Sequence, residues 1–243
     1  MRIGLGVLAV VGFVIGAIAL APLRWALSLA PIERLGLSAD SASGTIWNGR
    51  LSGVRFGGLS LGEAAVQANL TDLLRLTPGV RFGFRGPAGA GSGRISGSPQ
   101  AWRVAVREIA LAADQLPLPV ALDGQVTLRN VQLAFRDGAC AAATGELHTD
   151  ALAASAALLG WAGPPLGGAL ACAGDKARAV LTGAGADGAV VAVDVTLSPT
   201  LQLDARTKVT GIAPQIGAAL AGYGFAQAAD GFVRYDGGAL AQR

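Results

Sequence analysis

The sequence predicts a mainly β protein, in which a single N-terminal transmembrane helix is followed by a bent or strongly twisted, largely antiparallel β-sheet domain with a few short helices. Three observations support this fold class. Residues 3–21 form an uncharged apolar run, later segments alternate apolar and polar residues with a period of two, and turn-forming dipeptides recur between them. We expect an anchor over residues 1–22, a lead segment over 23–38, a β-rich domain over 39–236 and a tail over 237–243.

The run from Ile3 to Ala21 is nineteen residues long and carries no charge. A helix of about 20 apolar residues spans the hydrocarbon core of a bilayer, so the run predicts a membrane anchor. A cleaved signal peptide is the main alternative, because Met1-Arg2 supplies a positive start and Ala19-Leu20-Ala21 resembles a cleavage site. Pro22 follows that site and disfavours cleavage, so we favour the retained anchor; a buried helix of a soluble protein is a third alternative.

The side of the membrane on which the domain lies is inferred from the residues that follow the anchor. Arg2 on one side nearly balances Arg24 and Arg34 on the other, so the positive-inside rule does not decide. About 220 residues follow the anchor with no second span, and they carry two cysteines and a strand-rich pattern. We therefore expect a single-pass protein with its N-terminus in the cytoplasm and the lead and β-rich domain in the periplasm.

Two glycines of the anchor have the spacing of a helix-packing motif. Gly12 and Gly16 form a small-xxx-small pattern, which lets two transmembrane helices approach closely. The alternative is background glycine in a chain that contains 36. Gly12 and Gly16 are thus our candidates for helix packing in the membrane.

Composition favours a thin sheet over a thick globular core. Hydrophobic residues make up 52% of the chain and the mean hydropathy is +0.49, but only 5% of residues are aromatic. The net charge of +3 is small and its basic residues are scattered, whereas nucleic-acid binding requires basic residues clustered on one face. We expect no nucleic-acid partner.

Cys140 and Cys172 are the only cysteines. In an oxidising periplasm, a lone pair of this kind most often forms a disulfide. Closing a loop of about 33 residues would stabilise the fold by about 3–4 kcal/mol in the chain-entropy model. The alternative is a pair of buried free thiols. A redox role is not expected, because the Cys-x-x-Cys spacing is missing.

The clearest strands lie in three segments with strict alternation. Residues 80–85, 191–197 and 201–209 each place apolar side chains at every second position, which is typical of strands with one wet face. Residues 198–200, Ser-Pro-Thr, form a natural hairpin connection between the last two. Residues 86–98, rich in Gly and Ser, are predicted as a loop or a weak strand.

Six dipeptides suit turns that need positive φ, and five of the chain's acidic residues lie in them. The dipeptides are Asn48-Gly49, Asp123-Gly124, Asp137-Gly138, Asp187-Gly188, Asp230-Gly231 and Asp236-Gly237. Because turn formation explains these aspartates, few carboxylates remain as candidate catalytic groups.

Three segments shift their apolar phase by one residue, at Gly57-Gly58, Arg107-Glu108 and Arg129-Asn130. A shift of one exchanges the two faces of a strand, so a continuous strand must bulge there. We therefore expect a bent sheet, with ordinary strand breaks as the alternative.

Short helices are expected in two places. Residues 69–76 end before Pro78-Gly79, and residues 214–221 begin with a proline in the first turn and end before Gly222. The pattern of residues 152–159 is compatible with either helix or loop.

No catalytic or metal site is predicted, and no cofactor. His148 is the only histidine, so neither a zinc site nor a Gly-x-Ser-x-Gly hydrolase elbow with its histidine is supported. Residues 183–188 have the spacing of a dinucleotide-binding loop but precede a predicted strand, which favours a glycine-rich hairpin loop. We expect His148 to occupy a sheet surface.

Three segments together resemble a known family. They are residues 43–49 (SGTIWNG), residues 124–128 (GQVTL) followed by Cys140, and residues 165–172 (PLGGALAC), the last ending at Cys172. In this order after a single anchor, they resemble type II secretion system protein N, the general secretion pathway N component, over most of the chain. The resemblance implies an inner-membrane protein with its bulk in the periplasm, in the machine that exports folded proteins through an outer-membrane secretin.

Three functions follow for comparison. The favoured one is a non-enzymatic assembly component that contacts other type II secretion subunits, namely the inner-membrane platform and, as a further candidate, the secretin. The alternative is a periplasmic lipid-handling groove, because the chain is also distantly similar to AsmA-like bent-sheet proteins. A periplasmic hydrolase using His148 is the third.

Trp47, in the segment of residues 43–49, is expected to pack in the core, with a binding role as the alternative.

Overall fold

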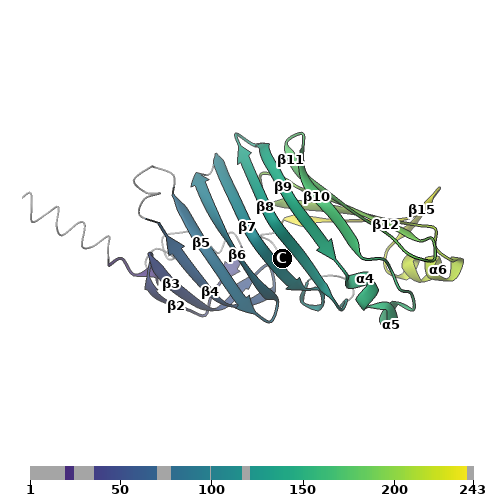
Figure 1. Ribbon diagram of the computed structural model, residues 1–243, viewed down its shortest axis with the longest axis horizontal. Helices are drawn as coiled ribbons and strands as arrows, with labels where there is room; N and C mark the ends of the chain where they lie inside the picture. Colours follow the sequence, from purple (N-terminus) through teal and green to yellow (C-terminus); the bar gives the residue numbers. More distant parts are fainter. Residues whose placement is uncertain (1–19, 25–35, 70–77, 99, 117–120, 240–243) are drawn as a thin grey trace, which may run out of the picture.

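One antiparallel sheet of fifteen strands makes up most of the protein (Figure 1). The computed structural model describes residues 20–24, 36–69, 78–98, 100–116 and 121–239. The strand order is β1-β3-β4-β5-β6-β7-β8-β9-β10-β11-β12-β13-β15-β14, and β2 pairs with β3 beside β1. Nearly every strand therefore pairs with its neighbour in sequence, and the strands follow one another along the long axis of the molecule.

The strands of the first half are β1 (Leu37–Ser38), β2 (Ser41–Thr45), β3 (Asn48–Phe56), β4 (Leu59–Ala68), β5 (Gly79–Gly86), β6 (Gly89–Ser98), β7 (Ala101–Ala112) and β8 (Gln125–Arg136). Those of the second half are β9 (Ala139–Thr149), β10 (Leu166–Ala173), β11 (Lys176–Ala184), β12 (Val190–Leu197), β13 (Gln202–Thr210), β14 (Ala226–Ala228) and β15 (Gly231–Ala239). The helices are the 3-10 turn η2 (Ala113–Gln115), α4 (Ala151–Ala154), α5 (Ala156–Leu159) and α6 (Pro214–Gly222).

The predicted fold class is confirmed as a mainly antiparallel β-sheet with a few short helices. The predicted anchor falls almost wholly on residues 1–19, which lie outside the described residues, as does most of the helix expected over 69–76. Within the described ranges, no helix has the length and apolar character needed to cross a membrane. The four-region division of the chain stays a prediction.

Alternation located the strands well. The segments 80–85, 191–197 and 201–209 are β5, β12 and β13, and residues 198–201 connect the last two as a hairpin. Residues 86–98, left open between loop and weak strand, contain β6. Its glycines are covered by aromatic rings, because Cβ atoms at Gly91 and Gly93 would lie 2.8 Å from the rings of Phe84 and Phe82.

Two of the three phase shifts are bulges within continuous strands. In β7, Glu108 pairs with Ser92 and Val106 with Gly93, so Arg107 is an extra residue. In β8, the pairing with β9 shifts between Arg129 and Gln132, where Asn130 adopts a φ of 50°. The shift at Gly57-Gly58 is instead the turn between β3 and β4, an ordinary break.

Two of the six predicted turns are wrong. Thr45 pairs with Asn48, so Ile46 and Trp47 form the turn themselves and Asn48-Gly49 opens β3. Asp236 and Gly237 lie within β15, where they pair with Ala205 and Asp204. The prediction at Asp137-Gly138 is confirmed, because both residues have positive φ, at 49° and 77°, as a tight hairpin turn requires.

The helix predicted over 214–221 is confirmed as α6, with Pro214 in its first turn. The ambiguous segment 152–159 is helical, as α4 and α5. Pro214 suits the first turn because that position has no hydrogen-bond acceptor for a backbone N–H.

The core consists of three clusters spread along one face of the sheet, as the low aromatic content suggested. Their buried members are, from the N-terminal end, Leu23, Leu51 and Val54, then Leu133, Phe135, Ala143 and Ala177, then Leu166, Ala179, Leu181, Val191 and Val209. The buried members come from strands, except Leu23 in the first cluster, and the third cluster is also covered by Leu152 of α4 and Leu220 of α6.

The chain before β1 is fastened to the edge of the sheet. The Ile46 N–H donates to the Ala21 carbonyl at 3.2 Å, and Pro22 forms an isolated bridge with Thr45. Leu23 is only 5% exposed and packs with Leu51 and Val54. The N-terminal segment therefore extends the sheet at β2.

Replacing Phe135 by alanine tests the middle cluster. Phe135 is 2% exposed and its ring lies 4.7 Å from that of Trp102, centroid to centroid. We expect Phe135→Ala to lower the free energy of unfolding by about 3–5 kcal/mol, because a large buried side chain leaves a cavity. Urea unfolding of the full chain in mild detergent measures it.

Val180→Ala serves as the control, because Val180 is exposed on the opposite face; we expect a loss of less than about 1 kcal/mol. Equal losses in the two variants would contradict the assignment of the core to one face.

Candidate functional site

The sheet presents one continuous apolar face. A single cross-strand row passes through Leu51, Ala64, Phe84, Gly91, Ile109, Leu128, Leu147 and Gly168, from β3 to β10. Among the described elements there is one sheet only, so no second sheet packs on this face. It is most open at β5 and β6, where Val80 is 41% and Ile95 49% exposed. We call this surface the apolar face.

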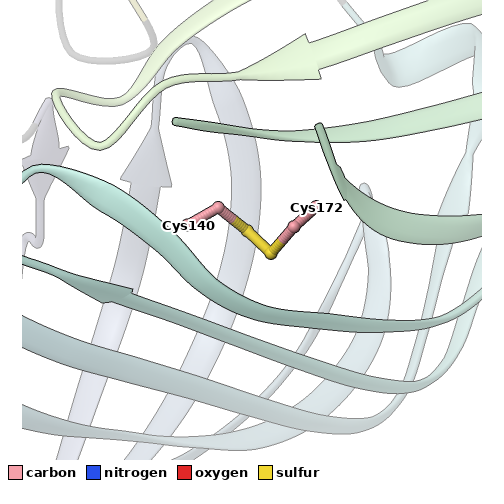
Figure 2. The surroundings of a disulfide bond; sticks show 2 residues. All are labelled: Cys140 and Cys172. Carbon is pink, nitrogen blue, oxygen red and sulfur yellow. A yellow bond between two sulfur atoms is a disulfide. The ribbon is translucent and has the colours of Figure 1, made fainter. Parts of the chain in front are cut away.

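A disulfide joins Cys140 of β9 to Cys172 of β10, with the two Cα atoms 5.7 Å apart (Figure 2). Backbone pairing between these strands is short: four registered pairs, against nine between β8 and β9 and eight between β11 and β12. The pairs run from Leu166 opposite Thr149 to Ala169 opposite Glu146. The bond lies beyond the end of that ladder, where the Cys140 N–H donates to the Asp175 carbonyl at 3.0 Å.

The disulfide therefore crosses the least paired joint of the long strands. Cys140 also packs with Leu133, Phe135 and Ala177, which come from both sides of the joint. We call the β9–β10 joint the seam, because it divides the sheet into β1–β9 and β10–β15. The covalent bond and the middle cluster together hold these two parts in one sheet.

Charges in the second part of the sheet are neutralised in pairs, of which Arg234 and Asp236 lie on the same face of β15 as Phe232. These pairs are Lys176 with Asp204 at 3.5 Å, Arg178 with Asp194 at 2.6 Å, Lys208 with Asp230, and Arg234 with Asp236 at 2.5 Å. Arg178 contacts Asp194 with both Nε and a terminal nitrogen, at 2.8 and 2.6 Å. A two-point contact of this kind fixes the orientation of both side chains.

Two aspartates have lowered pKa values with a clear cause. The hydrogen bonds from Arg178 hold the pKa of Asp194 below its ordinary value, against a smaller opposing effect of burial. The Trp161 indole N–H donates to Asp187 at 2.8 Å and, with the Ala189 backbone N–H, lowers the pKa of that carboxyl. Asp187 thus ties the β11–β12 loop to the segment after α5.

His148 occupies an exposed position in β9, as predicted for a sheet surface. Its nearest charged partner is Glu146, with the imidazole Nε2 at 3.7 Å from the carboxylate. Across the described ranges, no three His, Cys, Asp or Glu side chains gather closely enough to hold a metal ion. His148 and Glu146 are thus neighbouring side chains on the exposed surface of β9.

The other predicted positions are accounted for separately. Gly12 and Gly16 lie outside the described residues, so helix packing there stays a prediction. Trp47 is half-buried in the β2–β3 turn. Residues 183–188 form the end of β11 and the loop before β12, the hairpin that the following strand had indicated. The sequence reasoning missed the seam, since no pattern in the chain reports how many pairs two strands share.

Fold and surfaces together define a class of protein: a single-layer antiparallel β-sheet with one apolar face and a disulfide across the β9–β10 joint. The family described as type II secretion system (T2SS), protein N, matches residues 35–235, and the chain belongs to that family.

One curated relative is the type II secretion system protein N of Vibrio cholerae serotype O1, strain El Tor Inaba N16961. It is 34% identical over 136 residues, which are 52% of this chain and 53% of the relative. The chain thus matches about half the length of that relative. No solved structure matches the chain.

Removing the disulfide tests its role at the seam. We expect the double variant Cys140→Ser with Cys172→Ser to lose about 3–4 kcal/mol in free energy of unfolding, because the unfolded chain gains the freedom of an open loop. Hydrogen exchange should become faster at the backbone amides of β9 and β10, and to a greater extent there than at those of β7 and β8.

A reductant gives the matched control. It should destabilise the parent to the level of the double variant and leave the double variant unchanged. Uniform acceleration of exchange across all strands would contradict a local role at the seam.

The Arg178–Asp194 pair predicts a pH dependence. Because the folded pKa of Asp194 lies below its ordinary value of 3.8, the pair stabilises the fold at pH values above 3.8 and this contribution is lost as the pH falls through the folded value. We expect Arg178→Gln to be less stable than the parent at neutral pH, with the difference vanishing in acid. Urea unfolding at several pH values measures it.

Arg136→Gln, at an exposed position with no ion pair among the described residues, should match the parent at every pH. A difference for Arg178→Gln that persists unchanged in acid would show that the ion pair is not its cause.

Proposed function

We propose that the chain acts in type II secretion as a non-enzymatic component of the inner membrane and periplasm, involved in the assembly of the apparatus or the export of folded proteins. The observation that carries this proposal is the extent of the family match. Residues 35–235 begin just before β1 and end within β15, so the region shared with the family is the sheet itself.

The proposed location is a single-pass protein of the inner membrane with a cytoplasmic N-terminus and a periplasmic sheet. The apolar run from Ile3 to Ala21 supports the anchor, and the disulfide suits an oxidising compartment. The chain after this run meets the sheet at Pro22, so the sheet would begin close to the membrane surface.

The proposed partners are other type II secretion subunits, namely the inner-membrane platform and, as a further candidate, the secretin. A long sheet with an exposed polar face and an apolar face that is partly open at β5 and β6 offers a large contact area, and Gly12 and Gly16 would add a contact within the bilayer. Neither a cofactor nor a nucleic-acid partner enters this proposal. A non-enzymatic role is supported by the exposed position of His148, whose one charged neighbour is a glutamate.

The second candidate function is a lipid-handling groove, and the openness of the apolar face favours it. Val80 and Ile95 expose large apolar side chains beside the half-buried Phe82 and Phe84. An exposed apolar lining of this kind is uncommon on soluble proteins and suits acyl chains as well as a protein partner.

Photo-crosslinking in cells that carry the whole secretion apparatus distinguishes the two. A photoreactive residue at Val190, which is 43% exposed on the β12 hairpin, should capture a secretion subunit. The same residue at Ile95 reports what covers the apolar face. Products are identified by mass spectrometry, for protein and for lipid separately.

Val191 provides the matched control, because it is the next residue but only 1% exposed and should capture nothing outside the chain. A secretion subunit captured at either exposed position supports assembly. Capture of lipid alone at both would overturn that proposal in favour of lipid handling.

A further inference from the structure

Strands β5–β8 form a hollow rimmed by arginines. Its volume is about 510 Å³, and its lining includes Arg81, Ser92, Arg94, Arg107, Asn130 and Gln132. Of the described residues that line it, none is acidic. The remaining lining residues are Phe82, Gly93, Val106 and Val131, which form the adjacent row of the apolar face, and Ala105. Only β9 separates the hollow from the second part of the sheet with its ion pairs.

The two bulges shape this hollow. Arg81, Arg94, Ala105 and Gln132 form one cross-strand row, and the small Ala105 leaves space in the middle of that row. Beside it, Arg107 and Asn130 lie opposite each other between the pairs Val106–Val131 and Glu108–Arg129, and the two bulges are in the pairing of β7 with β6 and of β8 with β9. Bulges redirect side chains and are frequent beside functional sites. Here they bring a third arginine and an amide to the row.

Charge on these strands is strongly unbalanced. Strands β3–β8 carry nine arginines and two glutamates, whereas β9–β15 carry five lysines and arginines and four carboxylates. Within the described part of the chain, the side chains of Arg81 and Arg107 make no ion pair, and the nearby Glu108 is engaged by Arg129 at 3.4 Å. Arg81 also stands directly opposite Arg94 in the pairing of β5 with β6.

We propose that this hollow binds a phosphate-type anion, which supplies the missing negative charge between Arg81 and Arg107. A phosphate or phosphodiester presents several acceptor oxygens in different directions, which suits guanidinium groups from different strands together with the hydroxyl of Ser92 and the amides of Asn130 and Gln132. A lone carboxylate, with two oxygens in one plane, is satisfied by a single guanidinium. The anion is either a phospholipid headgroup or free phosphate. The site goes beyond the proposed function and does not depend on it.

Hydrogen exchange of the full chain tests the site with two probes. The first is inorganic phosphate, added to the chain in non-ionic detergent and compared with sodium chloride at equal ionic strength. The second is phosphatidylglycerol in nanodiscs, compared with phosphatidylcholine alone in phosphate-free buffer. We expect slower exchange at the backbone amides around Arg107 and Asn130.

Two double variants separate the site from general charge. In Arg81→Gln with Arg107→Gln, the anion concentration needed for half of the protection from exchange should rise about tenfold or more, because two charged donors are removed. Arg103→Gln with Arg136→Gln removes the same charge from exposed positions of β7 and β8 outside the lining and should retain the effect. All four side chains are exposed, so both variants should keep the parent's unfolding midpoint.

The outcomes decide both the site and its source. Protection by phosphatidylglycerol and not by phosphate assigns a headgroup, and protection by phosphate without phosphatidylglycerol assigns a soluble anion; protection by both assigns the shared phosphate chemistry. If neither phosphate nor phosphatidylglycerol protects these amides, the proposal is overturned. Equal loss of protection in the two double variants also overturns it.

Discussion

The constraint on which the structure depends is that a single sheet must shield its own apolar face. With no second sheet to pack against it in the described chain, burial comes from side chains of the same sheet lying against one another and, at the C-terminal cluster, from α4, α6 and their connecting segments. This explains why the core is divided into three clusters and why small residues are abundant. Phe82 and Phe84 cover glycines of β6, and Phe135 packs on Trp102, so each aromatic ring shields backbone or ring surface that another layer would otherwise cover.

Because the sheet is a single layer, the link between its two parts depends on the seam between β9 and β10. Strands β9 and β10 share four backbone pairs, and the covalent bond adds a second link between the two parts of the sheet beyond the end of that ladder. The division also coincides with a change in electrostatics. Among the described residues before the seam, Arg55 and Arg129 have carboxylate partners but Arg81 and Arg107 do not, whereas strands after it pair Arg178 and Lys208 with aspartates. One sheet thus offers two chemically different polar surfaces.

Features that depend on local sequence could be predicted, and features that depend on register could not. Period-two alternation located β5, β12 and β13, and two cysteines in a chain expected to be periplasmic suggested the disulfide. The phase shift that marks a bulge at Arg107 is the same signal that marks a turn at Gly57-Gly58, so sequence alone could not separate them. Asn48-Gly49 failed as a turn because its partner Thr45 decides where the hairpin closes. The arginine hollow needs four strands in a particular register, which no segment records by itself.

The order of strands has a further consequence for how the chain acquires its structure. Because almost every strand pairs with the one before it, contacts are close in sequence and little chain must be ordered before each new pairing is rewarded. A chain released N-terminus first can add strands in succession to the growing edge, beginning with β3 on β2. Each new strand then needs to pair only with the strand that was added to the sheet before it. In this order of assembly, Cys140 and Cys172 are oxidised after β10 has been added, and the disulfide then stabilises the pairing of strands that have already formed.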